Sequence, residues 1–211
     1  MYVDQKNVYY YITLMNENYV HPDMPEGIEE GIIKGMYLLK EDTTNRKVRA
    51  QLLGSGTILR EVEAAAEILS EQFDVACDVW SVTSFNELGR DVQSTDRWNM
   101  LHANEKPHLS YIRECLQNRG QVAVAATDYM KMYADQVRKD VPMEYTVLGT
   151  DGFGRSDTRK KLRHFFEVDR FYVCIGVLHA LCQQGLIEAS VVKKAQEEFN
   201  IDADKIDPML L

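Results

Sequence analysis

The chain has 211 residues, of which 45% are hydrophobic and 27% are charged, proportions that are typical of a soluble globular protein with a sizeable core. Its 24 basic and 33 acidic side chains give a net charge of −9, which opposes binding to nucleic acid and to anionic membranes. We therefore expect neither a nucleic-acid partner nor a membrane partner.

The N-terminal residues do not resemble a secretion signal. The apolar run 8–14 is rich in aromatic and β-branched residues and is too short to span a bilayer, so it predicts a buried strand. The cysteines are widely spaced and form no C-x-x-C pair; they are Cys77, Cys115, Cys174 and Cys182. We expect them to be buried, reduced thiols in a cytoplasmic protein, with no disulfide and no bound metal.

A boundary is expected near residue 46. Residues 26–40 predict a weak helix with two internal glycines, Gly31 and Gly35, and residues 42–45 predict a linker. We therefore expect residues 1–46 to be the end of one domain with a connector, and residues 47–211 to form a second domain.

From Lys47 onwards, predicted strands and helices alternate. The strands are expected at 48–53, 75–82, 121–127 and 145–149. The helices are expected at 58–72, from 85 onwards, around 130–137, and at 157–166, 170–184 and 188–199. This alternation predicts an α/β three-layer sandwich, in which helices cover both faces of a mostly parallel, possibly mixed, sheet of about five strands.

The turn after the first of these strands is a candidate anion site. Gly54, Ser55, Gly56 and Thr57 join a strand to a helix, where backbone N–H groups and the helix dipole favour anions. The third glycine of the dinucleotide-binding pattern is replaced by Leu59. A tight turn is therefore the simpler interpretation, and an anion site is the alternative.

The histidines show no metal-ligand spacing. His102 and His108 flank a loop with a proline, which we interpret as a surface or interface loop. His164 lies on a charged helix and is expected to be solvated or salt-bridged. His179 lies in an apolar helix and is expected at the core or its boundary.

Acidic side chains gather on two helical stretches and are interpreted as solvated helix faces. They are Glu61, Glu63, Glu67, Glu197 and Glu198. No nucleophile elbow surrounds Ser55, and no cysteine has an evident histidine partner. The residues therefore predict neither a catalytic residue nor a metal site.

The glycine-rich stretch 149–158 is interpreted first as a structural turn and second as an interface loop. We expect it at the carboxyl edge of the sheet, with Phe153 buried as an anchor, Arg155 projecting, and Ser156 capping the following helix. That helix should carry Leu162, Phe165 and Phe166 inward. The candidate interface residues of the loop are Asp151, Phe153, Arg155, Ser156 and Asp157.

Several longer motifs of the chain match the motifs of one protein family, and they occur in the same order as in that family. They are Tyr11–Tyr19, Met24–Gly27, Gln51–Gly56, Asp96–His102, Thr127–Lys131, Gly149–Asp157 and Phe199–Lys205. On these motifs the chain resembles the C-terminal part of the homodimeric pyruvate dehydrogenase decarboxylating component, a family similar to transketolase. The resemblance implies that residues 1–46 end a pyrimidine-binding domain and that 47–211 form a transketolase-like C-terminal domain.

The resemblance also implies the activity of a longer protein. Members decarboxylate pyruvate on thiamine diphosphate and magnesium, and they acetylate the lipoyl group of a transacetylase partner. Their C-terminal domain is expected to make dimer contacts with a second copy of the subunit and to shape the active-site entrance.

The cofactor signature of this family is not present in the chain. The family uses Gly-Asp-Gly followed by paired asparagines, whereas this sequence has Thr150-Asp151-Gly152 and no Asn-Asn. The activating glutamate of the family lies upstream of Met1. We therefore expect an inactive scaffold and dimer-interface domain that binds no cofactor. The alternative is an autonomous small-ligand or anion-binding regulatory module that uses the Gly54–Thr57 turn.

Overall fold

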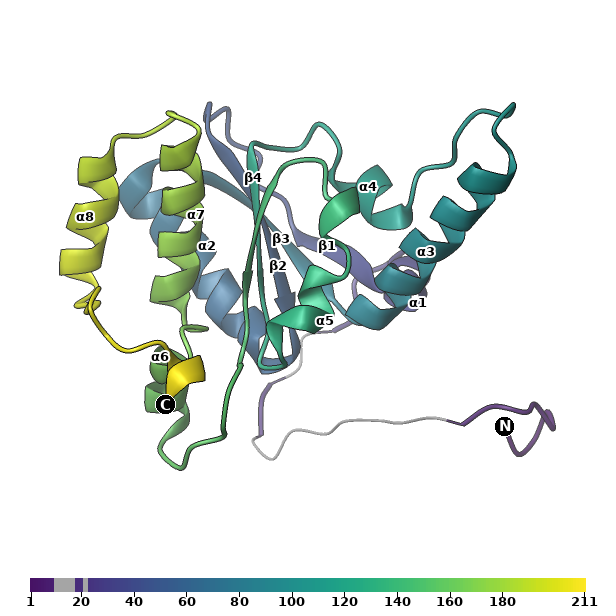
Figure 1. Cartoon of the computed structure of the whole chain (residues 1–211), viewed down its shortest axis with the longest axis horizontal. Coiled ribbons are helices and arrows are strands. Elements are labelled where there is room, and N and C mark those ends of the chain that lie inside the picture. The colour runs from purple at the N-terminus through teal and green to yellow at the C-terminus, as the bar shows by residue number, and fades with distance from the viewer. Residues whose placement is uncertain (10–17, 21–22) are drawn as a thin grey trace.

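The computed structural model describes residues 1–9, 18–20 and 23–211, and a single five-stranded sheet lies at its centre (Figure 1). The strands are β1 (Met36–Lys40), β2 (Arg49–Ser55), β3 (Ala76–Val82), β4 (Val122–Ala126) and β5 (Glu144–Leu148). Their order in the sheet is β1-β3-β2-β4-β5. β2 to β5 are parallel, and β1 pairs antiparallel with β3. The predicted mixed, mostly parallel sheet is confirmed.

Helices cover both faces of this sheet (Figure 1). On one face lie α2 (Leu59–Phe73) and α7 (Arg170–Gln183), with α8 (Ala189–Glu198) packed on α7. On the other face lie α3 (Phe85–Leu101), α4 (Tyr111–Leu116) and α5 (Lys131–Asp135). The remaining short helices are α1 (Glu29–Lys34), α6 (Arg159–Phe165) and the 3-10 turns η1 (Gly56–Ile58), η2 (Arg138–Asp140) and η3 (Pro208–Leu210).

The core consists of two apolar layers, one on each side of the sheet. Successive side chains of a strand point to opposite faces, so Leu52 joins the layer under α2 and α7, while Leu53 joins the layer under α3 and α5. β3 and β4 are buried along their whole length. Strands buried on both faces are typical of a parallel sheet between two helical layers, and the predicted three-layer sandwich is confirmed.

The helix predicted over 26–40 is wrong in its second half. α1 ends at Lys34, and Gly35 takes a left-handed conformation with φ of 106°. A Cβ at this position would lie 2.6 Å from the backbone oxygen of Ser84, so a glycine is required here. The chain then continues as β1, because Met36 and Tyr37 pair with Val82 and Ser81 of β3. This pairing is a tertiary contact that local propensity does not report.

The strand predicted over 8–14 falls mainly outside the described residues, and its first two residues, Val8 and Tyr9, are exposed and belong to no strand. The helix predicted around 130–137 is only five residues long. Ala134 and Val137 are buried as expected, but Met130 and Tyr133 are 51% and 40% exposed. Among the described residues, no helix is long and apolar enough to cross a membrane.

Candidate functional site

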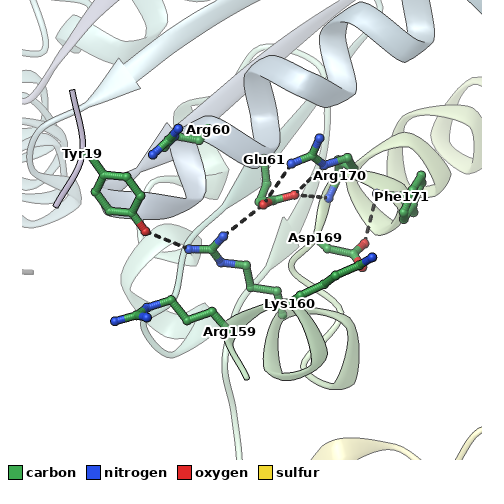
Figure 2. Close-up of a pocket in the computed structure, with 9 residues that line it drawn as sticks. Tyr19, Arg60, Glu61, Arg159, Lys160, Asp169, Arg170 and Phe171 are labelled. Atoms are coloured by element: carbon green, nitrogen blue, oxygen red, sulfur yellow. Dashed lines mark hydrogen bonds and ion pairs between the residues drawn. The ribbon is translucent and has the colours of Figure 1, made fainter. Parts of the chain in front are cut away.

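A cleft of about 580 Å³ lies where the N-terminal ends of α2 and α7 meet α6 (Figure 2). α2 follows the carboxyl end of β2, and α6 and α7 follow that of β5, so the cleft is at the carboxyl edge of the sheet. Its lining is five cations, two carboxylates and two aromatic residues: Arg60, Arg159, Lys160, Arg163, Arg170, Glu61, Asp169, Tyr19 and Phe171. We call this the basic cleft.

Glu61 is the buried centre of the basic cleft, only 6% exposed. Its carboxylate accepts hydrogen bonds from the backbone N–H, Nε and Nη2 of Arg170, at 3.2, 2.8 and 3.3 Å, and from Nη1 of Arg163 at 3.1 Å. The prediction that Glu61 lies on a solvated helix face is therefore wrong. Burial of a carboxylate is tolerated here because two guanidinium groups satisfy it. Glu67, Glu197 and Glu198 are exposed, as predicted, whereas Glu63 is half-buried and pairs with Lys40 at 2.9 Å.

The pKa of Glu61 reflects two opposing effects. Burial favours the neutral acid and works to raise the pKa. The hydrogen bonds and charge of Arg170, together with the charge of Arg163, outweigh burial and hold the pKa below its ordinary value of 4.5. The bonds from Glu61 in turn raise the pKa of Arg170. The lowered pKa keeps the Glu61 carboxylate ionised at neutral pH, where it is shared by the two guanidinium groups.

Tyr19 connects the N-terminal segment to the basic cleft (Figure 2). The Arg60 guanidinium lies 4.3 Å from the centre of its ring, and its hydroxyl oxygen accepts a hydrogen bond of 3.4 Å from Nη2 of Arg163. Arg163 is thus held on one side by Glu61 and on the other by Tyr19.

Asp169 caps the N-terminal end of α7. Its Oδ1 accepts hydrogen bonds from the backbone N–H groups of Phe171 and Tyr172 at 3.0 and 3.1 Å, which makes it the N-cap of the helix. Its Oδ2 lies 2.9 Å from Nδ1 of His164. His164, which was expected to be solvated or salt-bridged, is half-buried and contacts this carboxylate, so the Asp169 carboxylate is directed at the helix backbone and at His164.

The Gly54–Thr57 turn lies at the same edge of the sheet and is tightly packed. A Cβ on Gly54 would lie 2.7 Å from Cα of Leu59, which explains the glycine as a packing requirement. The hydroxyl of Thr57 donates a hydrogen bond of 3.3 Å to Oδ2 of Asp128. A carboxylate beside the turn repels an incoming anion. The anion site predicted at this turn stays a prediction, and the charge next to it disfavours it.

The loop 149–158 follows β5 at the carboxyl edge, but its details differ from those expected. Phe153 is 79% exposed, so the prediction of a buried anchor is wrong. The guanidinium of Arg155 lies 5.7 Å from the ring centre of Phe165. Thr158, not Ser156, is the N-cap of α6, and its hydroxyl accepts a bond of 3.5 Å from the backbone N–H of Lys161.

The helix start was predicted two residues too early, because Ser156 and Thr158 both satisfy the cap preference and sequence alone does not rank them. The remaining residues of the predicted interface set, Asp151 and Asp157, hydrogen-bond to the backbone N–H groups of Lys131 and Thr158 at 3.2 and 2.7 Å. The helix does carry Leu162, Phe165 and Phe166 onto the core, as expected.

The other histidines and the cysteines that the sequence analysis named lie outside the basic cleft. His102 and His108 both stack on the indole ring of Trp98, with ring centres 4.3 and 3.5 Å from that of the indole. His179 is exposed, so the prediction that it lies at the core or its boundary is wrong. All four cysteines are free thiols, of which Cys77 and Cys174 are buried and the other two are only half-buried. Burial raises the pKa of Cys174 to about 12.

The described residues do not fit a site for magnesium. Among the described residues, no group of three or more His, Cys, Asp or Glu side chains is arranged to hold a metal ion. Asp151, the acidic residue of the Thr150-Asp151-Gly152 stretch, already accepts a hydrogen bond from the backbone of α5.

Sequence reasoning missed the basic cleft, although one signal was present. Residues 159–163 contain four basic side chains in a chain whose net charge is −9. A basic cluster on a short helix of an acidic protein indicates local positive potential. The partners of this cluster, Tyr19 and Glu61, lie far away in the sequence and could not be assigned from it.

Comparison with known proteins finds a matching family model, similar sequences and a similar solved structure. A family model described as "Transketolase-like TK C-terminal domain" matches residues 35–169. The pyruvate dehydrogenase E1 component of Pseudomonas aeruginosa is 58% identical over 99% of this chain and 24% of its own length. That of Escherichia coli K12 is 56% identical over 98% of this chain and 23% of its own length. Transketolase from Leishmania mexicana, a solved structure, is 18% identical, with a TM-score of 0.49 over 73% of this chain and 19% of that one.

The fold and the cleft define a three-layer α/β domain with a basic pocket at the carboxyl edge of its sheet. The family match covers well over half of the chain. The chain belongs to the transketolase-like C-terminal domain family. It spans about a quarter of the length of the curated pyruvate dehydrogenase E1 components that it matches.

Proposed function

We propose that this chain is the C-terminal scaffold and interface domain of a pyruvate dehydrogenase E1 component, and that it has no catalytic activity by itself. The observation that carries the proposal is the 58% identity that extends over 99% of this chain but only 24% of the relative. The longer protein would decarboxylate pyruvate on thiamine diphosphate and magnesium, and would pass the acetyl group to the lipoyl group of a transacetylase. It would act in the cytoplasm as a homodimer.

The interface role is supported by exposed apolar side chains at the carboxyl edge of the sheet. Met130, Met132 and Phe153 are 51%, 63% and 79% exposed, although large apolar side chains gain free energy by burial. Apolar side chains gathered on one edge are typical of contact surfaces. We propose that the pyrimidine-binding domain or the second subunit covers them in the longer protein.

The extent of the domain is also a proposal. The expected division at residue 46 separates the connector from residues 47–211. A cut there would remove β1 from the sheet, because Met36–Lys40 pairs with β3. We therefore propose that the folded unit includes β1 and that the connector ends before it.

A chimera tests the proposal. The C-terminal quarter of the Pseudomonas aeruginosa relative is replaced by this chain, and assembly and pyruvate-dependent activity are compared with the unaltered protein. We expect a soluble dimer whose kcat lies within about tenfold of the parent, because a domain that is 58% identical to the one it replaces should fold in the same way and restore the interface. A folded chimera that neither assembles nor turns over pyruvate would refute the assignment.

A further inference from the structure

A second groove, of about 420 Å³, lies at the carboxyl edge of the sheet between the start of α3 and α5. Its described lining is Ser55 at the end of β2, residues 83–86 at the start of α3, and Tyr129 and Tyr133 at α5. We call this the switch groove. We propose that it binds a small uncharged ring compound that bears hydroxyl groups, of the sugar class. The inference rests on this groove alone and does not depend on the activity of a longer protein.

The switch groove lies where the strand order of the sheet reverses. β2 is followed by α2 on one face of the sheet, and its neighbour β4 is followed by α5 on the other face (Figure 1). Adjacent parallel strands whose connections leave to opposite faces open a crevice beyond their carboxyl ends, and open α/β sheets bind ligands there. Ser55 is the last residue of β2, and Tyr129 comes shortly after the end of β4. The groove therefore occupies the position at which such sheets bind small molecules.

Ser55 points most directly to a ligand. It is only 8% exposed, and it lies on the face of β2 that carries Leu53 into the core. Within the described part of the chain its hydroxyl forms no hydrogen bond. The neighbouring hydroxyls of Thr83 and Ser84, by contrast, bond to the backbone at 2.8 and 3.1 Å. A mostly buried hydroxyl without a partner in the fold is unfavourable, and a ligand group in the groove would supply the partner.

Gln136 joins the two helical walls of the groove and orients Asn86. Its Nε2 donates to the backbone oxygens of Phe85 on α3 and Tyr133 on α5, at 3.1 and 2.7 Å. The same nitrogen donates to Oδ1 of Asn86 at 3.2 Å, so the Nδ2 group of Asn86 is turned away from Gln136. Among the described residues Nδ2 has no acceptor, and it is a donor for a ligand. Walls that are ordered in advance lower the entropic cost of binding.

Tyr129 and Tyr133 form an aromatic wall beside these polar groups. Their ring centres are 6.1 Å apart with the planes at 67°, and the side chains are 44% and 40% exposed. Aromatic rings of this kind gain free energy when a ligand covers them. A sugar ring has C–H groups on its faces and hydroxyl groups at its edge. It can therefore contact the aromatic wall while its hydroxyl groups reach Ser55 and Asn86.

The charges around the switch groove favour an uncharged ligand. None of the described residues that line it is charged. A charged ligand group would lose water without gaining an opposite charge, which is costly. The carboxylate of Asp128, which accepts a hydrogen bond from Thr57 close to Ser55, would also repel an anion. In this respect the groove differs from the basic cleft, whose lining is mainly cationic.

NMR titration of the full 211-residue chain tests the proposal. The probes are two neutral ring sugars, glucose and ribose, the open-chain polyol sorbitol, and the charged relatives glucose 6-phosphate and glucuronate. We expect saturable 1:1 binding of at least one neutral ring sugar with a Kd below about 10 mM, a limit that corresponds to a very weak site. Sorbitol and the charged relatives should bind at least about threefold more weakly, because sorbitol lacks the ring and the others carry an unpaired charge.

Matched variants locate the site. Ser55→Ala and Tyr133→Leu should each weaken binding of that sugar at least about fivefold, because they remove a polar partner and a ring face. Ser55→Ala should leave the melting temperature unchanged or raise it, because the lost hydroxyl has no partner in the fold. Circular dichroism checks that Tyr133→Leu is folded. The controls Ser156→Ala and Tyr2→Leu change exposed side chains outside the groove and should leave affinity unchanged.

Several outcomes would overturn the proposal. One is the absence of saturable binding of both ring sugars up to about 10 mM. Another is binding that survives in both groove variants, or that falls equally in the controls. Charged relatives that bind as tightly as the neutral sugars would exclude the uncharged class. A lower melting temperature in Ser55→Ala would show that the hydroxyl already has a partner in the fold.

Discussion

Arg170 and Glu61 stand 109 positions apart in the sequence and are joined by three hydrogen bonds. They connect the first turn of α7 to the first turn of α2, two helices on the same face of the sheet. The contact fixes both helices at the carboxyl edge and forms the inner wall of the basic cleft.

Replacing Glu61 with alanine should therefore destabilise the fold. The variant leaves two guanidinium groups without their carboxylate, and we expect a loss on the order of 2–3 kcal/mol in the free energy of unfolding. Urea denaturation measures the loss. The matched control is Glu63→Ala on the same helix, which breaks the more exposed pair with Lys40 and should cost at most about 1 kcal/mol. Equal losses of unfolding free energy in the two variants would show that Glu61 contributes no more to stability than the more exposed Glu63.

The same carboxylate should make stability depend on pH. The pKa of Glu61 is lower in the folded state than its ordinary value of 4.5, so the unfolded chain takes up its proton first as the pH falls. The contribution of Glu61 is complete above pH 4.5 and is lost as the pH falls below it towards the folded-state pKa. Urea midpoints measured across this acid range should decline less steeply for Glu61→Gln than for the unaltered chain. A parallel decline would contradict the assignment.

Gly54 should tolerate no side chain. In Gly54→Ala the new methyl group would meet Cα and Cδ1 of Leu59 at 2.7 and 2.8 Å, where the backbone enters α2. We expect a loss of about 1–3 kcal/mol, the usual range for overpacking a core. Gly154→Ala is the control, because no atom lies within 4 Å of its added Cβ. Thermal unfolding of both variants checks the difference, and an unchanged melting temperature in Gly54→Ala would show that the turn can shift.

The N-cap of α6 was expected at Ser156, whereas the structure places it at Thr158. Thr158→Ala should cost about 0.5–1 kcal/mol, since it removes the side-chain oxygen that accepts from the backbone N–H of Lys161. Ser156→Ala should leave the free energy of unfolding nearly unchanged. Chemical denaturation of the two single variants decides between the positions. A larger loss of unfolding free energy in Ser156→Ala than in Thr158→Ala would show that Ser156 is the cap after all.

Much of the fold could be predicted because its elements carry local signals. Apolar side chains repeat at helical spacing at Ile58, Val62, Ala65, Ala66 and Leu69, and all of them are buried as expected except Ala66, which is half-buried against the core. Strand β1 could not be predicted in the same way. Its five residues follow a short helix, and they form a strand because β3 offers an unpaired edge.

The candidate site was predictable only in part. The glycine turn at the edge of the sheet was visible, but its chemistry depends on Asp128, more than 70 residues further on. Glu61 looks like a solvated helical residue until α6 and α7 bring Arg163 and Arg170 beside it. Contacts between residues a hundred positions apart follow from tertiary packing, which no local pattern encodes.

Pyruvate turnover by the purified 211-residue chain is the most direct test of the proposal that this domain supplies fold and interface but no chemistry. The chain is assayed with thiamine diphosphate, magnesium, pyruvate and an artificial electron acceptor, with the full-length Pseudomonas aeruginosa relative as positive control. We expect product formation at the rate of the protein-free blank, because the described residues include no group arranged to hold the metal ion that the cofactor needs. Pyruvate-dependent turnover above that blank, which persists after gel filtration and in independent preparations, would contradict the proposal.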